Sequence, residues 1–219
     1  MDKKTIGFIG SDKYEILLYL SRILYHLNKK VLLVDFSETM ALTQSIPIPL
    51  ALAESETYLE YRGIDFIKGR NYYLNMNKEY DYVLFDFGYN HSILSSIYCN
   101  SIVYVTDLQL HHAKRLNITN KKGSQKNFII IKDVFPCKIT PDYILNELNP
   151  KVNIENIYII EQDALDIKVK IHSQYNQTFY FDKLSKSMKT FLKDIILQID
   201  ENLDKIQLQS AYKKAERGM

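Results

Sequence analysis

Short apolar runs bounded by polar residues alternate along the chain with segments whose apolar residues lie three or four positions apart. The first pattern is typical of buried strands and the second of helices. Five apolar runs predict the central strands, at 5–9, 31–34, 82–86, 101–106 and 127–131. Between the first two, a stripe at helical spacing predicts a helix that ends at Asn28: Ile16, Leu17, Leu20, Ile23, Leu24 and Leu27.

A strand, a helix and a strand within the first 35 residues make a βαβ unit. The two strands of such a unit are parallel, and its crossover is right-handed in nearly all proteins. The turn Gly10 to Glu15 therefore faces the N-terminus of the helix, where nucleotide-binding folds hold phosphate. Lys29 and Lys30 lie at the opposite, C-terminal end, where cations are favoured.

Weaker patterns predict the remaining elements. We expect helices at 50–61, 71–79, 92–98, 108–117 and 141–148. We expect two further short strands, at 64–67 and 157–160. Asp107 is positioned to cap the helix that follows it. The polar segment 119–126 is expected to be a loop.

The C-terminal region carries an apolar seam that advances by threes and fours. The seam consists of Met188, Leu192, Ile195, Ile199, Leu203 and Ile206. It predicts one helix at about 182–206 that docks on the body of the protein. The acidic polar face disfavours the alternative, a helix that binds anionic lipid. Residues 207–219 lack an apolar pattern and are expected to be frayed.

Strands that alternate with helices throughout define the α/β class. We therefore predict a three-layer fold with a mostly parallel sheet and helices on both faces. No long linker or internal repeat divides the sequence, so we expect one domain over 1–219.

Composition narrows the function classes. Hydrophobic residues at 46% and charged residues at 25% are typical of a soluble globular protein, and a net charge of +2 gives no strong attraction to nucleic acid. The N-terminus resembles no signal peptide and no apolar run reaches transmembrane length, so we expect a cytoplasmic protein. Cys99 and Cys137 are too few for a disulfide framework, and Cys99 is expected in the core.

Four segments, in order, resemble the ParA/MinD group of P-loop ATPases. They are Ile6 to Asp35, Tyr80 to Gly88, Ile102 to Leu116, and Asn127 to Lys132. This family positions plasmids, division sites, flagella and pili in bacteria. The resemblance implies a P-loop NTPase-like fold, protein partners and a homodimer that pairs face to face across the nucleotide.

The family's phosphate loop is not retained. That loop is a glycine-rich run with two lysines that ends Gly-Lys-Thr or Gly-Lys-Ser. Its amides and lysine bind phosphate, and its hydroxyl binds magnesium. Counting back from Asp35 places Tyr14 near the lysine and Glu15 near the hydroxyl. Gly10 is the glycine that remains, and Lys13 substitutes for the lysine only if the register shifts by one.

Two acidic residues also oppose phosphate binding in this turn. Asp12 and Glu15 bring negative charge to the place where a triphosphate would arrive. We interpret them instead as the N-cap and a first-turn acid of the helix.

The carboxylates that follow the strands are retained only in part. The family carries an Asp two residues after Asp35 that positions the attacking water, and this sequence has Ser37 there. The resemblance implies that Asp86 would reach magnesium through water. Both retained carboxylates have an alternative role as caps of the turns that follow their strands. The candidate residual nucleotide cleft thus contains Gly10, Lys13, Asp35 and Asp86, with no catalytic residue and no metal site assigned.

The adjacent residues His111 and His112 do not form a metal pair, because neighbours on a helix point in different directions. With Lys114 and Arg115 they could contact a phosphate backbone. No aromatic interleaving or basic stripe supports that role, so we expect a solvated helix face.

Three hypotheses follow. The first is a pseudo-ATPase without cofactor that acts as a localisation or assembly scaffold for a bacterial machinery, such as a secretion system, a pilus or a mobile element. The second is a divergent but genuine ATPase that binds ATP and magnesium with Lys13, Asp35 and Asp86. The third is an interaction module that is independent of nucleotide.

Overall fold

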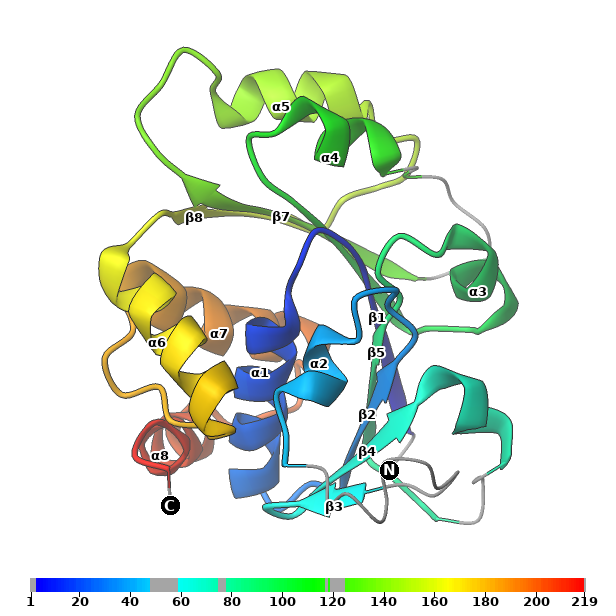
Figure 1. Ribbon diagram of the computed structural model, residues 1–219, viewed down its shortest axis with the longest axis vertical. Coiled ribbons are helices and arrows are strands. Elements are labelled where there is room, and N and C mark those ends of the chain that lie inside the picture. The colour runs from blue at the N-terminus through cyan, green and yellow to red at the C-terminus, as the bar shows by residue number, and fades with distance from the viewer. Residues whose placement is uncertain (1–2, 48–58, 75–77, 117, 119–124, 219) are drawn as a thin grey trace.

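The computed structural model describes residues 3–47, 59–74, 78–116, 118 and 125–218. The described strands form one eight-stranded sheet in the order β3-β4-β2-β5-β1-β6-β7-β8 (Figure 1). Their bounds are Lys4–Gly10 (β1), Val31–Asp35 (β2), Leu59–Tyr61 (β3), Ile64–Lys68 (β4), Tyr82–Asp86 (β5), Ser101–Thr106 (β6), Lys126–Val134 (β7) and Asn156–Glu161 (β8). Neighbouring strands are parallel except β3 and β4, which are antiparallel. The prediction that the five central strands share one parallel sheet is therefore confirmed.

Helices cover both faces of this sheet (Figure 1). The helices are Tyr14–His26 (α1), Ala41–Gln44 (α2), His91–Ser96 (α3), Leu110–Arg115 (α4), Pro141–Leu148 (α5), Ala164–Asn176 (α6), Lys186–Ile199 (α7) and Lys205–Glu216 (α8). One hydrophobic core lies between the sheet and α1, α7 and α8, and a second lies between the sheet and α4 and α5. The central strands are buried on both faces, which explains why they appear in the sequence as unbroken apolar runs.

The predicted helix between the first two strands is present as α1. Eleven of its residues, Tyr14 to Leu24, are buried. The helix ends where Asn28 adopts the left-handed conformation, with φ of 58°. Asn28 therefore closes the helix, as predicted, and the chain enters β2.

Several weaker predictions need correction. Residues 59–61 of the predicted helix 50–61 form strand β3, and residues 50–58 lie outside the described part of the chain. In place of the predicted helix 71–79, the described residues form a 3₁₀ helix, Gly69–Leu74, and residues 75–77 lie outside the described part of the chain. The predicted loop 119–126 also lies mostly outside the described residues. Asp107 is not the cap of α4, because that helix begins at Leu110 and the carboxylate accepts the amide of Gln109 at 2.8 Å.

The predicted single C-terminal helix is two helices. The chain turns at Asp200, whose carboxylate pairs with Lys4 at 2.9 Å. Ser185 caps α7 and Asp204 caps α8, so each helix has its own N-terminal signal. The earlier helix α6 was not predicted at all.

The apolar seam is confirmed within α7, and Leu203 beyond it is partly buried against the same core, but the seam does not extend to Ile206. Met188, Leu192, Ile195 and Ile199 are buried, whereas Ile206 is 78% exposed. The predicted frayed tail is wrong through Glu216, because α8 buries a stripe consisting of Leu208, Ala211, Tyr212 and Ala215. Across the described residues, every helix is too short or too polar to span a membrane.

Candidate functional site

The candidate site lies at the carboxyl edge of the sheet, where β1, β2 and β5 end side by side. Gly10 ends β1, and Asp35 and Asp86 are in register at the ends of β2 and β5. Lys13 follows from the turn into α1. The structure therefore brings together the four residues that the sequence indicated, although they span more than seventy positions of the chain.

Lys13 points into the protein and forms an ion pair with Asp86. Its ammonium nitrogen lies 2.7 Å from Oδ1 of Asp86 and donates to the carbonyls of Gly10 (3.2 Å) and Ser11 (3.3 Å). Both side chains of the pair are at least 96% buried. Asp86 also accepts the amide of Gly88 at 2.9 Å. An ammonium has three donors, so Lys13 is saturated by partners within the protein.

Asp35 is held as a turn cap. Its Oδ1 accepts the amide and the hydroxyl of Ser37, at 3.0 and 2.6 Å. Its Oδ2 accepts the amide and the hydroxyl of Thr43, both at 2.9 Å. Burial raises the pKa of Asp35 above its ordinary value, and the negative charge of nearby Asp86 raises it further. The hydrogen bonds from Ser37 lower the pKa but do not cancel this rise. All four contacts fix the loop after β2, which is the structural role that the sequence left open.

Gly10 has a packing role in the turn. Its amide donates to the carbonyl of Gly88 at 2.6 Å, and the amide of Ser11 donates to the carbonyl of Val105 at 2.8 Å. Gly10 has φ of 120°, and a Cβ there would lie 1.9 Å from the Val105 oxygen. Only glycine fits this close approach. The first two amides of the turn are thus directed at neighbouring carbonyls.

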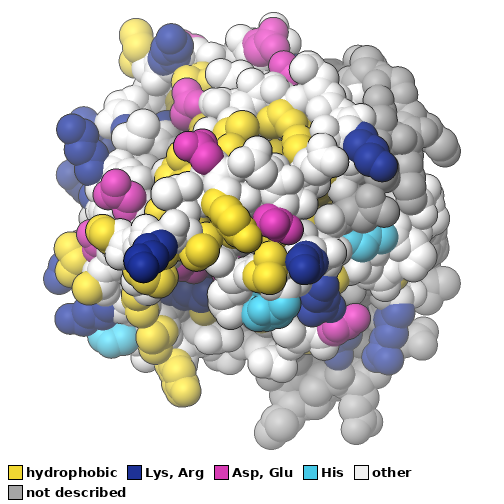
Figure 2. Space-filling model, turned by 90° about the horizontal axis from the view of Figure 1, so that it is seen from above, with side chains coloured by type: hydrophobic (Ala, Val, Ile, Leu, Met, Phe, Trp, Pro, Cys, Tyr) yellow, Lys and Arg dark blue, Asp and Glu magenta, His cyan; other side chains and the backbone are white. Residues whose placement is uncertain are grey.

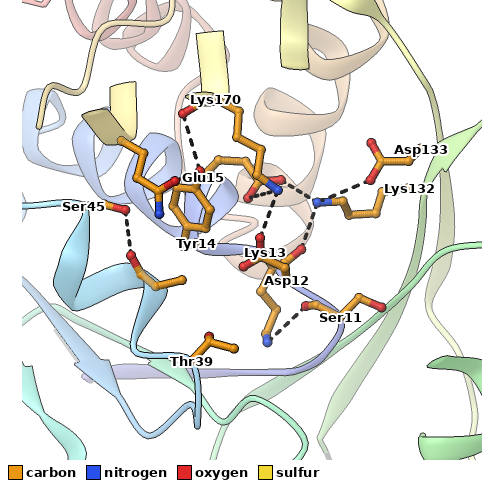
Figure 3. Close-up of polar contacts among 12 residues, drawn as sticks. Ser11, Asp12, Lys13, Tyr14, Glu15, Thr39, Ser45, Lys132, Asp133 and Lys170 are labelled. Atoms are coloured by element: carbon orange, nitrogen blue, oxygen red, sulfur yellow. Dashed lines mark hydrogen bonds and ion pairs between the residues drawn. The ribbon is translucent and has the colours of Figure 1, made fainter. Parts of the chain in front are cut away.

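The N-terminus of α1 is occupied by a network of charged side chains (Figure 3). The ammonium of Lys132 lies 2.6 Å from Oε1 of Glu15 and donates to the carbonyl of Asp12 at 2.8 Å. Lys170 of α6 lies 3.1 Å from Oδ2 of Asp12 and 3.5 Å from Oε2 of Glu15. Burial opposes the ionisation of Glu15, but Lys132 and Lys170 outweigh it and lower its pKa to about 2.

This network corrects one prediction and confirms another. Asp12 is not the N-cap of α1: that position is Lys13, and its side chain makes no capping hydrogen bond. Glu15 is a first-turn acid, as predicted, and its carboxylate is 94% buried. An internal carboxylate thus lies at the helix N-terminus, where phosphate is bound in nucleotide-binding folds.

Lys132 and Lys170 were missed as members of the site. Lys132 directly follows the apolar run 128–131 of β7, so its place at the carboxyl edge could have been inferred from the strand pattern. Lys170 lies on α6, which was not predicted because its apolar residues do not follow helical spacing, although Asp163 caps its N-terminus.

A cavity of about 680 Å³ opens beside Asp35. Its lining includes the apolar side chains of Phe36, Met40 and Ile93, together with Arg70. Neither Gly10 nor Lys13 lines it. The hollow is therefore displaced from the turn into α1, and its wall combines apolar side chains with the basic side chains of Lys68 and Arg70.

The paired histidines form no metal centre. Nδ1 of His112 lies 2.7 Å from Oδ2 of Asp107, and no cluster of three potential metal ligands exists among the described residues. Figure 2 shows the molecule from above α4 and α5, where acidic, basic and apolar side chains are interspersed. This surface agrees with the solvated face that we expected for α4.

Comparisons with known proteins identify the fold. No family profile and no curated protein sequence matches the chain. Among solved structures, a ParA family ATPase from Chlorobium tepidum is similar, with a TM-score of 0.53, 16% identity and coverage of 97% of both chains. MinD in the MinC:MinD complex of Aquifex aeolicus gives 0.58 at 13% identity, over 88% of this chain and 95% of that one. A putative plasmid partition protein from Borrelia burgdorferi, bound to AMPPNP, gives 0.55 at 11% identity, over 97% and 99%.

At sequence identities this low, the structural similarity shows a shared fold. The chain has the ParA/MinD type of P-loop NTPase-like fold, which confirms the fold that the resemblance implied. The residues of the site do not fit magnesium-ATP, since the amides of Gly10 and Ser11, the ammonium of Lys13 and both carboxylates already have partners in the protein.

Proposed function

We propose that the chain is a non-hydrolysing protein of the ParA/MinD fold that acts as a cytoplasmic localisation or assembly scaffold. Its expected setting is a bacterial machinery such as a secretion system, a pilus or a mobile element. The observation that carries this proposal is the buried ion pair between Lys13 and Asp86. A phosphate loop must offer its lysine to the ligand, and here the lysine neutralises a carboxylate of the same chain.

Energetics support weak nucleotide binding. Separating one partner from a buried ion pair costs about 3–5 kcal/mol, because the other charge is left uncompensated. A contact between a charged group and phosphate returns about 1.5–3 kcal/mol. Recruitment of Lys13 by ATP would therefore bring no net gain, and we expect an affinity weaker than roughly millimolar.

The environment of Ser37 supports the absence of hydrolysis. Ser37 stands where the resemblance places the water-positioning carboxylate. Its hydroxyl donates to Asp35 at 2.6 Å and accepts the amide of Met40 at 3.1 Å. A hydroxyl that caps a turn in this way supplies no base for an attacking water.

The proposed partner is another protein. The similar MinD structure is a complex with MinC, whereas the similar pNOB8 ParA structure is bound to nonspecific DNA, with a TM-score of 0.52. A net charge of +2 and the mixed surface over α4 favour a protein partner for this chain.

We also propose self-association by analogy with the fold family. Sedimentation at tens of micromolar, with and without ATP, tests it, and a pure monomer in both would contradict it.

One observation favours a second candidate function, a divergent ATPase. Lys13, Asp35 and Asp86 do lie together at the carboxyl edge, as an ATP site would require. A phosphate-release assay with magnesium-ATP separates the candidates. We expect no turnover above the buffer blank, and no difference between the wild type and Asp86→Ala. Turnover that disappears in Asp86→Ala, while the variant remains folded, would establish the divergent ATPase instead.

A further inference from the structure

Strand β8 forms one edge of the eight-stranded sheet (Figure 1). It pairs with β7 on one side and, among the described residues, with no strand on the other. Alternate residues of a strand direct their backbone amides and carbonyls to opposite sides, so part of the backbone of β8 faces away from the sheet. Such an edge can pair with a strand of another chain.

The side chains of β8 do not protect this edge. Soluble proteins commonly block an exposed edge with proline or lysine. The six residues Asn156–Glu161 contain neither. Two of them are apolar and exposed, Ile157 at 40% and Ile159 at 49%. Exposed apolar side chains therefore lie beside the outward backbone groups of β8.

A groove of about 740 Å³ lies between β8 and α7. Tyr158 of β8 and Phe191 of α7 both line it, and their rings meet edge to face with centroids 5.1 Å apart. The hydroxyl of Tyr158 donates to Oδ2 of Asp194 at 3.0 Å. These contacts hold the middle of the strand against the middle of the helix. We call this hollow the edge groove.

The wall that α7 gives to the edge groove carries a row of three polar side chains. They are Lys186, Thr190 and Asp194. Residues four positions apart lie on one face of a helix, and the ends of this row are about 12 Å apart along the axis. Among the described residues, the only ion pair made from α7 joins Lys189 to Glu216. The row thus ends in two opposite charges that have no ion-pair partner in the described part of the chain.

We propose that two copies of this chain pair through the edge groove, edge to edge about a two-fold axis. This inference rests on the self-association proposed above and assigns that association to a surface. In a two-fold interface, each contact occurs twice with the roles of the copies exchanged. With the axis at Thr190, the two α7 helices run antiparallel, and Lys186 of each copy faces the partner's Asp194.

The same axis brings the two β8 strands together. Tyr158 lies in the middle of β8 and contacts Phe191 and Asp194, so the middle of the strand lies close to the axis. Two antiparallel strands pair directly through their backbone groups, and the exposed Ile157 and Ile159 of the two copies then contact each other. The outward backbone groups of β8 gain partners, and the two sheets become one continuous sheet.

The arrangement of the charges favours a second copy over a strand of an unrelated protein. Lys186 and Asp194 lie four residues before and four residues after Thr190. A two-fold interface requires this symmetry of opposite charges, and another ligand does not. The candidate site lies at the ends of β1, β2 and β5, away from this edge, so pairing through the edge groove needs no nucleotide.

Sedimentation equilibrium in the absence of ATP tests the proposal through the dissociation constant of the dimer. Lys186→Glu places like charges opposite each other at both ends of the interface. Lys186→Glu/Asp194→Lys restores opposite charges with their signs exchanged. Lys114→Glu makes the same change at an exposed position of α4 and is the matched control. Circular dichroism melting of each variant verifies that it remains folded.

We expect the wild type to dimerise, Lys186→Glu to weaken the dimer about tenfold or more, and the double variant to recover to within about threefold of the wild type. The control should not change. Equal dissociation constants for all four proteins would mean self-association through another surface and would overturn this proposal alone. A wild type that remains monomeric at tens of micromolar would overturn both this proposal and the self-association.

Oxidative cross-linking locates the axis independently. Thr190→Cys is made in a Cys137→Ser background, so that the remaining native thiol, Cys99, is buried. We expect a disulfide-linked dimer from this variant under mild oxidation, and none from Lys114→Cys in the same background. Linked dimers from neither variant, or equally from both, would overturn the proposed axis.

Discussion

The ammonium of Lys13 lies 2.7 Å from the carboxylate of Asp86, and the two charges are buried together between the N-terminus of α1 and the end of β5. This pair links Lys13, which takes the place of the phosphate-loop lysine only if the register shifts by one, with the carboxylate that the resemblance assigns to magnesium. The ammonium of Lys13 neutralises Asp86, as a magnesium ion would. The carboxylate of Asp86 neutralises Lys13, as a phosphate would. The site is thus electrostatically complete without a nucleotide.

Removal of either partner of this pair should destabilise the protein strongly. We expect Lys13→Met or Asp86→Asn to lower the free energy of unfolding by about 3–5 kcal/mol, because a buried charge loses its partner. The double variant should lose at least about 2 kcal/mol less than the sum of the two. Urea denaturation measures all three. The exposed pair Lys126 and Glu201 is the control, with a coupling energy below about 1 kcal/mol. Additive effects at Lys13 and Asp86 would contradict the ion pair.

Glu15 should make stability depend on pH in acid. Its pKa is about 2 in the folded protein and 4.5 in the unfolded chain, so the unfolded state binds more protons between these values. The contribution of Glu15 is complete above pH 4.5 and is lost as pH falls toward 2, by about 3 kcal/mol in total. Between pH 4.5 and 3, the wild type should lose about 1 kcal/mol per pH unit more than Glu15→Gln.

Urea denaturation at stepped pH provides this comparison. Asp35 has a raised pKa and acts in the opposite direction, since stability from that group falls as pH rises. Asp35 is present in both the wild type and Glu15→Gln, so its contribution cancels in the difference between their free energies of unfolding. Parallel pH profiles for the wild type and Glu15→Gln would show that Glu15 is not held as an ion pair.

The apolar seam of α7 should be sensitive to charge. Ile195 is fully buried, so Ile195→Asp should lower the free energy of unfolding by several kcal/mol, about 3 or more, through burial of an unpaired charge. Ile206→Asp is the matched control, because Ile206 is 78% exposed and the same substitution there should cost less than about 1 kcal/mol. Thermal melting followed by circular dichroism distinguishes them. An unchanged melting temperature for Ile195→Asp would mean that α7 does not dock on the sheet.

The last helix should contribute to stability in the same way. Leu208 is 2% exposed, and Leu208→Ala should cost about 2–5 kcal/mol through lost burial and the cavity left behind. Gln209→Ala, on the exposed side of α8, should be nearly neutral. Equal urea midpoints for the two variants would indicate that residues 207–216 are frayed after all.

The sheet could be predicted from the sequence because its signal is local. Each central strand is buried on both faces, so its residues are apolar without interruption. Helix α6 could not be predicted in this way, because Ile167 and Ile171 are exposed while Ser173 is buried. The break between α7 and α8 was missed because the spacing of apolar residues continued across it, although Asp204 signalled a new helix.

The members of the site could be predicted, but their contacts could not. Strand ends placed Gly10, Asp35 and Asp86 at one edge, since parallel strands share that edge. The partner of Lys13 depends on its side-chain direction, which the sequence pattern does not contain. The ion pair of Glu15 with Lys132 joins residues 117 positions apart, so no local pattern indicates it.

We propose that the site is filled by its own charges and does not hold ATP. Calorimetric titration with magnesium-ATP up to millimolar concentration tests it most directly, on the wild type and on Lys13→Ala. We predict no saturable heat that depends on Lys13, and an affinity weaker than roughly millimolar. Micromolar binding that Lys13→Ala abolishes, while the variant remains folded, would contradict the account and establish a divergent nucleotide site.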